Sequence, residues 1–149
     1  MNAIRCEGWD TLAALRERMG RTRAALSAPG GLYRRLEALL SGWLAENFDT
    51  QGGLLEGPAG HWPPLARSTI AARRRQGRGL RPLEATGRLR RGLRAWSDEG
   101  GVTLENPVPY AAAHQLGQGV PRRAFLPGAA QAGRLAYPEL ERFVREALR

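Results

Sequence analysis

The chain has 149 residues, of which 42% are hydrophobic and 25% are charged, and its formal net charge is +9. This length predicts one domain, residues 1–149, with a sizeable core, and the hydrophobic content excludes wholesale disorder. No apolar run approaches the roughly 18 residues that cross a bilayer. Charged residues interrupt the N-terminus where a signal peptide would be apolar, so we expect a cytosolic starting point and no membrane segment.

All 23 basic residues are arginines. Guanidinium groups favour planar, bidentate contacts with carboxylates or phosphates. A basic chain of this size therefore suits either an acidic protein surface or a nucleic-acid backbone, and charge alone does not choose between them. The single cysteine, Cys6, excludes an intrachain disulfide and is best interpreted as a small hydrophobe.

The first half of the chain predicts one short strand and two helices. Ala3–Cys6 fits an edge strand, and apolar residues at helical spacing follow it between Leu12 and Met19. Pro29 and two glycines then break the chain. Between Leu32 and Phe48, seven large apolar residues form a wide stripe over about four turns, which predicts an amphipathic helix.

From Asp49 to Pro82 the chain lacks a sustained hydrophobic period and is rich in glycine and arginine. Only Ser68–Gln76 fits a helical turn or two. A connection of this length inside a compact domain is usually functional or disordered. We therefore expect residues 49–82 to form a long projecting loop that becomes ordered only on docking to a partner.

The next segment is ambiguous between two periods. Leu89, Leu93 and Trp96 fit a helix, whereas Leu89, Leu93 and Ala95 fit alternation along a strand. The acidic and glycine residues at 98–101 are typical of a hairpin turn. We favour a short helix from Thr86, followed by a hairpin over about residues 93–105.

The last third of the chain predicts two helices and a strand. Val108–Leu116 fits a short helix that ends at Gly117, Arg123–Leu126 fits a strand, and Pro138 opens a C-terminal helix over residues 138–149. Together these elements predict an α+β fold. A small antiparallel sheet would pack against the 32–48 helix and the apolar face of Leu140–Leu148.

No arrangement of residues suited to catalysis is visible. The two histidines, His61 and His114, lie far apart and match no metal-ligand spacing. The serines lack a nucleophile-elbow context, and the glycines near Arg78 lack the lysine and helix of a phosphate loop. We therefore predict no enzyme, no metal and no cofactor.

A basic block runs from Arg67 to Arg94, and Glu84 is its only acidic residue. Such a block could neutralise phosphates and bind nucleic acid without reading its sequence. It could equally form an arginine-rich protein interface, with Trp62 as an anchor. A basic, non-specific nucleic-acid-binding module therefore stays open as an alternative function.

Several motifs follow one another from about Leu32 to Leu126. Their residues are Phe48; Trp62, Leu65, Thr69 and Arg73; Leu83, Thr86, Gly87 and Leu89; Tyr110, Ala111, His114, Gln115 and Gly117; and Pro121, Arg123, Phe125 and Leu126. This order and spacing resembles the virion-morphogenesis, or tail-completion, proteins of contractile-tailed phages such as Mu. One departure is Ala124, which stands where a second proline is common in that family.

The resemblance implies a structural part in virion assembly, which completes the head-proximal end of the tail or joins the tail to the head at the neck. It implies assembly in the host cytoplasm, a place in the virion, and a ring of copies, for which six is the natural number on a sixfold tail. The partners would be tail-tube or terminator proteins and head-connector proteins, with non-specific contact to packaged DNA as a further option.

The residues that we expect to meet a partner are basic or aromatic and lie in two segments: Trp62, Arg73, Arg74, Arg75 and Arg78, and then Arg122, Arg123 and Phe125. We expect a second group to hold the fold: Thr86, Gly87, Tyr110, His114 and Gly117. Thr86 would cap a helix, and Tyr110 would combine an apolar face with a polar tip.

Overall fold

The computed structural model describes residues 9–57 and 60–149. These residues form six helices and one two-stranded sheet, in the order α1 (Trp9–Ser27), α2 (Gly30–Asp49), α3 (Arg67–Arg75), α4 (Arg88–Arg91), β1 (Arg94–Asp98), β2 (Gly101–Glu105), α5 (Ala111–Leu116) and α6 (Ala129–Ala147). The expected α+β class is confirmed. The strand expected at Ala3–Cys6 lies outside the described residues.

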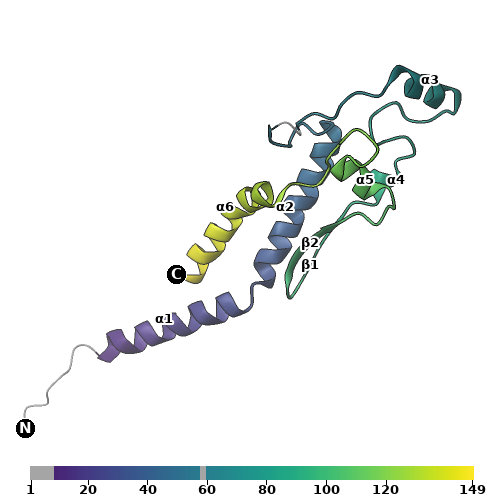
Figure 1. The fold of residues 1–149 in the computed structure, drawn as a ribbon. Coiled ribbons are helices and arrows are strands. Elements are labelled where there is room, and N and C mark those ends of the chain that lie inside the picture. Colours follow the sequence, from purple (N-terminus) through teal and green to yellow (C-terminus); the bar gives the residue numbers. More distant parts are fainter. Residues whose placement is uncertain (1–8, 58–59) are drawn as a thin grey trace, which may run out of the picture.

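Helix α2 is the central element. Figure 1 shows it between α6 and the hairpin, with α1 extending from one end of the molecule and α3 standing at the other. The apolar stripe that predicted this helix buries Leu32, Leu40, Trp43, Leu44 and Phe48. The helix contacts both strands and α6, so one amphipathic helix organises the layers around it.

The predicted hairpin is confirmed. Strands β1 and β2 pair in antiparallel register, with Arg94 opposite Glu105 and Trp96 opposite Thr103. The Asp98 carboxylate accepts hydrogen bonds from the backbone N–H groups of Gly100 (2.7 Å) and Gly101 (3.2 Å). Gly101 has a φ of 143°, a conformation that residues with a Cβ rarely adopt.

Two predictions about the C-terminal helix are wrong. Helix α6 begins at Ala129, so Pro138 lies inside it instead of opening it. Proline removes one backbone donor from the helix, but Pro138 faces solvent, where water can bond the freed carbonyl. Gln131 and Leu135, in the first turns of this longer helix, are the residues that face the core. Leu140, Val144 and Leu148, which we expected to pack on the sheet, are exposed.

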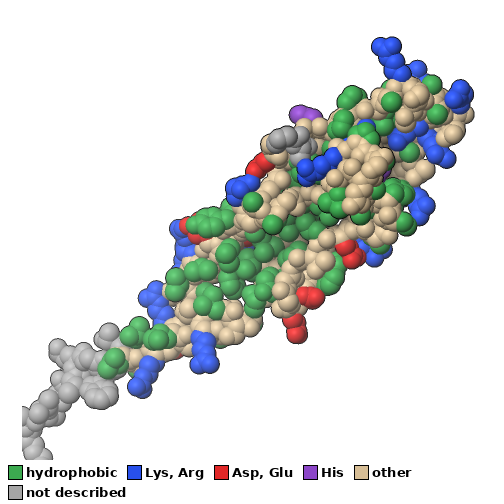
Figure 2. Space-filling view, viewed as in Figure 1, with side chains coloured by type: hydrophobic (Ala, Val, Ile, Leu, Met, Phe, Trp, Pro, Cys, Tyr) green, Lys and Arg blue, Asp and Glu red, His purple; other side chains and the backbone are tan. Residues whose placement is uncertain are grey.

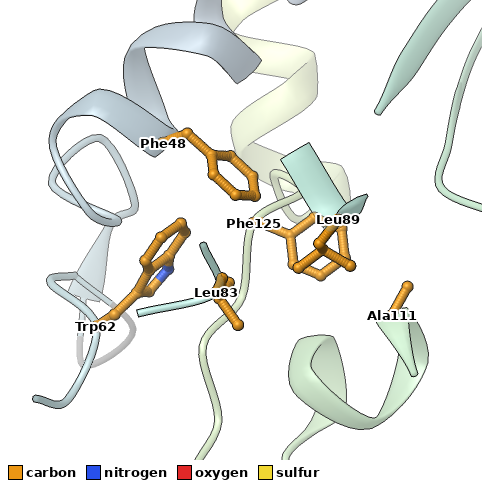
Figure 3. Close-up of a cluster of buried hydrophobic side chains, with 6 residues drawn as sticks. All are labelled: Phe48, Trp62, Leu83, Leu89, Ala111 and Phe125. Carbon is orange, nitrogen blue, oxygen red and sulfur yellow. The ribbon is translucent and has the colours of Figure 1, made fainter. Parts of the chain in front are cut away.

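The core has two connected clusters of buried side chains. One joins Phe48, Trp62, Leu83, Leu89, Ala111 and Phe125 (Figure 3), and the other joins Trp43, Leu44, Leu55 and Ala124. The ring of Phe48 meets Trp62 edge-on, with centroids 4.9 Å apart. Leu55 and Trp62 belong to the expected loop, so this part of residues 49–82 is anchored on the core instead of projecting from it.

The segment 121–127 is not the predicted strand, because no strand pairs with it. Side chains bind its backbone instead. The amide oxygen of Gln115 accepts from the N–H groups of Phe125 (2.9 Å) and Leu126 (3.0 Å), and its Nε2 donates to the carbonyl of Leu126 (3.2 Å). The indole N–H of Trp62 donates to the carbonyl of Ala124 (2.6 Å), and Asn47 donates to that of Phe125 (3.4 Å). We call this arrangement the clasp.

Removing the aromatic ring at the centre of the clasp should be costly. Phe125 is 1% exposed, and truncating such a side chain to alanine costs about 3–5 kcal/mol because a cavity remains. We expect Phe125→Ala to lower the free energy of unfolding by that amount in urea titration. The control is Leu116→Ala, at an exposed site. An equal loss in the two variants would contradict this account of the core.

The amide of Gln115 should matter as much as an apolar core residue. Gln115→Ala leaves two backbone N–H groups and one carbonyl without their partner, which should cost about 2–4 kcal/mol. The matched control is Gln118→Ala, three residues later on the exposed surface. Urea unfolding that is unchanged in Gln115→Ala would show that the clasp contributes nothing to stability.

Candidate functional site

Several of the predicted site residues come together around one cavity. It has a volume of about 280 Å³ and is lined by Arg73, Arg78, Leu83, Ala85, Thr86, Arg88, Tyr110 and His114. Its walls come from α3 and the turn after it, the loop before α4, and α5. No carboxylate lines it. We call it the His114 pocket.

Arg73 shapes this pocket by holding the turn that follows α3. Its Nη1 donates to the carbonyls of Gly79 and Arg81, both at 2.9 Å. Arg81 in turn donates to the carbonyl of Asp49 at 2.7 Å. Arg73, which we expected at an interface, therefore ties its segment to α2, because its guanidinium satisfies carbonyls that no strand or helix pairs.

Other arginines of the block are free for outside contacts. On α3, the turn after it and the first residue of α4, five exposed guanidinium groups have neither a hydrogen-bond nor an ion-pair partner among the described residues: Arg67, Arg74, Arg75, Arg78 and Arg88. We call them the basic face. Blue side chains gather in Figure 2 at the end of the molecule where Figure 1 places α3.

The electrostatics of the pocket disfavour further positive charge. Burial lowers the pKa of His114 from its ordinary value of 6.5, and the charges of Arg123 and Arg73 lower it further. The His114 Nδ1 is buried and has no partner among the described residues. The ring of Tyr110 meets that of His114 edge-on at 6.1 Å. A neutral histidine among guanidinium groups suits an anionic group such as a carboxylate.

Three residues expected at an interface lie inside the protein instead. Trp62 is 6% exposed, Arg123 6% and Phe125 1%. Trp62 and Phe125 belong to the clasp, and Arg123 donates to the carbonyls of Pro63 (2.9 Å) and Pro64 (3.1 Å). Trp62 is buried because its indole bonds the carbonyl of Ala124, Phe125 because its ring fills the apolar cluster, and Arg123 because it bonds the two proline carbonyls. Arg122 is exposed and donates to the carbonyl of Gln115 at 3.3 Å.

The residues expected to hold the fold have different outcomes. Thr86 makes no capping bond, and Gly87 occupies the N-cap of α4 with a φ of 70°. A Cβ on Gly87 would meet only the guanidinium end of Arg91, which can move aside, so the glycine is needed for its positive φ rather than for space. Gly117 ends α5 in the left-handed conformation, as predicted. Tyr110 is exposed and lines the pocket.

Sequence reasoning did not identify the buried amides that hold the core. Asn47 is fully buried on α2 within an apolar stripe, and Gln131 donates to the carbonyl of Leu54 at 2.6 Å. A polar residue in an otherwise apolar helical stripe was the available signal for Asn47. Gln131 had none, because residues 129–137 were not predicted as helix.

The described residues also lack two features that would point to other functions. No cluster of three or more histidine, cysteine, aspartate or glutamate side chains could hold a metal ion there. None of the described helices is long and apolar enough to cross a membrane.

Comparison with known proteins decides the family. A family model described as the phage virion morphogenesis family matches residues 10–142. The chain belongs to the phage virion morphogenesis family. This membership supports a role in phage virion assembly, associates the protein with the virion and points to a structural part. Comparisons with curated proteins and with solved structures give no match.

The depressed pKa of His114 predicts acid sensitivity. Below the ordinary value of 6.5 the unfolded chain takes up a proton that the folded chain resists, so the free energy of unfolding falls as the pH drops through that range. We expect His114→Gln to lose less stability than wild type between pH 7 and pH 5 in urea titrations. The control, His61→Gln at an exposed site, should behave like wild type. Identical slopes in all three proteins would remove His114 from this role.

Proposed function

We propose that the protein completes the head-proximal end of a phage tail or joins the tail to the head, by docking the basic face onto an acidic surface of a neck or tail protein. Family membership supports virion assembly. The observation that carries the finer proposal is the basic face, whose Arg78 and Arg88 line the His114 pocket, at one end of an elongated molecule (Figure 1).

The pocket favours a protein partner over a nucleic-acid backbone. Leu83 and Tyr110 add apolar and aromatic surface to a concave site, and interfaces between proteins are enriched in tyrosine and arginine at their centres. A glutamate or aspartate side chain entering the pocket could pair with Arg78 and Arg88. Phosphates would find the same charges on α3, which makes contact with packaged DNA a second candidate for the exposed arginines.

The assembly that we propose is a ring of identical copies. A part at the end of a tail must match the symmetry of that tail, and a head-to-tail contact that closes on itself generates a ring. Six copies suit a sixfold tail. In this proposal the copies assemble in the host cytoplasm and meet tail-tube or terminator proteins on one side and head-connector proteins on the other.

Reversing charge on the basic face should block joining. We expect phage that carry Arg74→Glu with Arg78→Glu to accumulate separate full heads and complete-length tails, because like charges would then face the acidic partner. The matched control is Arg34→Glu with Arg94→Glu, which makes the same charge change at exposed sites on α2 and β1. Electron microscopy of lysates counts joined and separate particles. Joined virions in the basic-face variant would contradict the proposal.

Binding to DNA separates the two candidates for the basic face. Titration of the purified protein with non-specific duplex at several salt concentrations gives the number of phosphates that it neutralises. We expect the basic-face variant and its control to bind equally weakly. A steep salt dependence in wild type that the basic-face variant loses and its control keeps would favour contact with packaged DNA instead.

A further inference from the structure

We infer that the apolar side of α1 in one copy docks on the outward side of α6 in a neighbouring copy. This inference rests on the proposed ring and names the surface through which the copies meet. It comes from a different end of the molecule than the basic face, as Figure 1 shows.

Helix α1 carries an apolar stripe that its own chain does not cover. Leu12, Leu15, Met19 and Leu26 are each between 50% and 64% exposed. Together with Thr22 they alternate spacings of three and four residues, which places them along one side of a helix in the pattern of a coiled-coil seam. A seam of this kind normally faces another helix.

The side-chain hydrogen bonds that join α1 to the rest of the described chain lie at one place, the end of α6. Arg18 donates to the carbonyl of Leu148 (2.9 Å from Nε), and Thr22 donates to that of Ala147 (2.8 Å). These bonds attach the middle of α1 to the end of α6. Beside the attachment lies an open groove of about 570 Å³, which includes Leu15, Met19, Leu26 and Leu148 in its lining.

Helix α6 carries the second half of the surface. Tyr137, Leu140, Val144 and Leu148 are between 38% and 63% exposed, and they follow one another at three- and four-residue spacings. Leu148 lines the groove with α1, so the two stripes meet at the attachment point. The protein thus presents two neighbouring helical surfaces whose apolar residues face solvent.

The chain exposes more surface than a compact monomer of its mass, by about the area that contacts with two neighbours would cover. The accessible surface is 10470 Å², whereas a compact monomer of 16.3 kDa has about 7,500 Å². The ten residues outside the described ranges could expose at most about 1,600 Å² as unfolded chain, so a surplus of about 1,400 Å² belongs to the rest. Two interfaces of standard size cover about 1,600 Å² of each copy.

The charges favour a contact of α1 with α6 of the neighbouring copy over a contact between two α1 helices. Residues 12–27 contain four arginines and one acidic residue, Glu17. Two α1 helices side by side would therefore set like charges against each other. Helix α6 carries three glutamates and three arginines, so its charges balance, and Glu141, next to Leu140 of the stripe, pairs with Arg145. When α1 of one copy contacts α6 of the next, each pair of copies still has one α1 and one α6 surface free for further copies, as a ring requires.

The first test measures self-association of the purified chain. We expect the mass of the wild-type protein, measured by light scattering, to exceed that of a monomer and to increase with protein concentration. The double variant Leu15→Asp with Met19→Asp should stay monomeric. The control is Leu80→Asp, an exposed apolar site after α3, which should associate like wild type. Circular dichroism and urea unfolding check that the α1 variant keeps its fold.

The second test identifies which surfaces meet. In chains with Cys6→Ser, one variant carries Leu15→Cys and another carries Val144→Cys, and the two differ in mass by a tag. On mild oxidation of an equal mixture we expect the mixed disulfide dimer to exceed each homodimer by well over the twofold that random pairing gives. The control mixture pairs Leu80→Cys with Val144→Cys and should give only background.

The outcomes separate this inference from the proposed function. Association that persists in Leu15→Asp with Met19→Asp would overturn the surface named here and leave the ring in place. A monomeric wild type without mixed disulfide would overturn the inference. Neither outcome alters the head-and-tail counts that test the basic face.

Discussion

The structure depends on the clasp, in which Asn47, Trp62 and Gln115 bind the backbone of residues 124–126. Buried backbone groups must be paired, and most proteins pair them in a sheet. Here the sheet of the described residues has only two strands, so side chains from three separate segments supply the partners. This constraint packs Phe125 into one cluster with Phe48 and Leu89 and holds the loop, α2 and α5 to one another (Figure 3).

The clasp also positions the pocket. Gln115 follows His114 on α5, so the bonds that hold Gln115 to residues 125 and 126 determine where His114 lies. Arg123, one residue before the clasp, donates to the carbonyls of Pro63 and Pro64 and contributes to the charge that lowers the pKa of His114. The folding core and the basic pocket are therefore parts of one hydrogen-bonded unit.

The motif pattern that relates this chain to its family has a physical meaning in these terms. Trp62, Gln115 and Phe125 are members of the clasp, so the pattern marks how the domain folds. The arginines that remain free for a partner, such as Arg74 and Arg78, lie mostly between the motifs. A structural assembly part needs this division, because its core must be kept while its contact surfaces match a particular neighbour.

The sequence by itself determined those elements that depend on interactions between residues close together in the chain. The apolar period of α2, the Asp98 turn of the hairpin and Gly117 at the end of α5 each act over a few residues, and each was predictable. Only the tertiary structure decided that Arg123–Leu126 is no strand, that Trp62 and Phe125 are buried, and that Pro138 lies inside α6. The reason is that these outcomes depend on which distant groups bind a backbone segment, and periodicity carries no information about such partners.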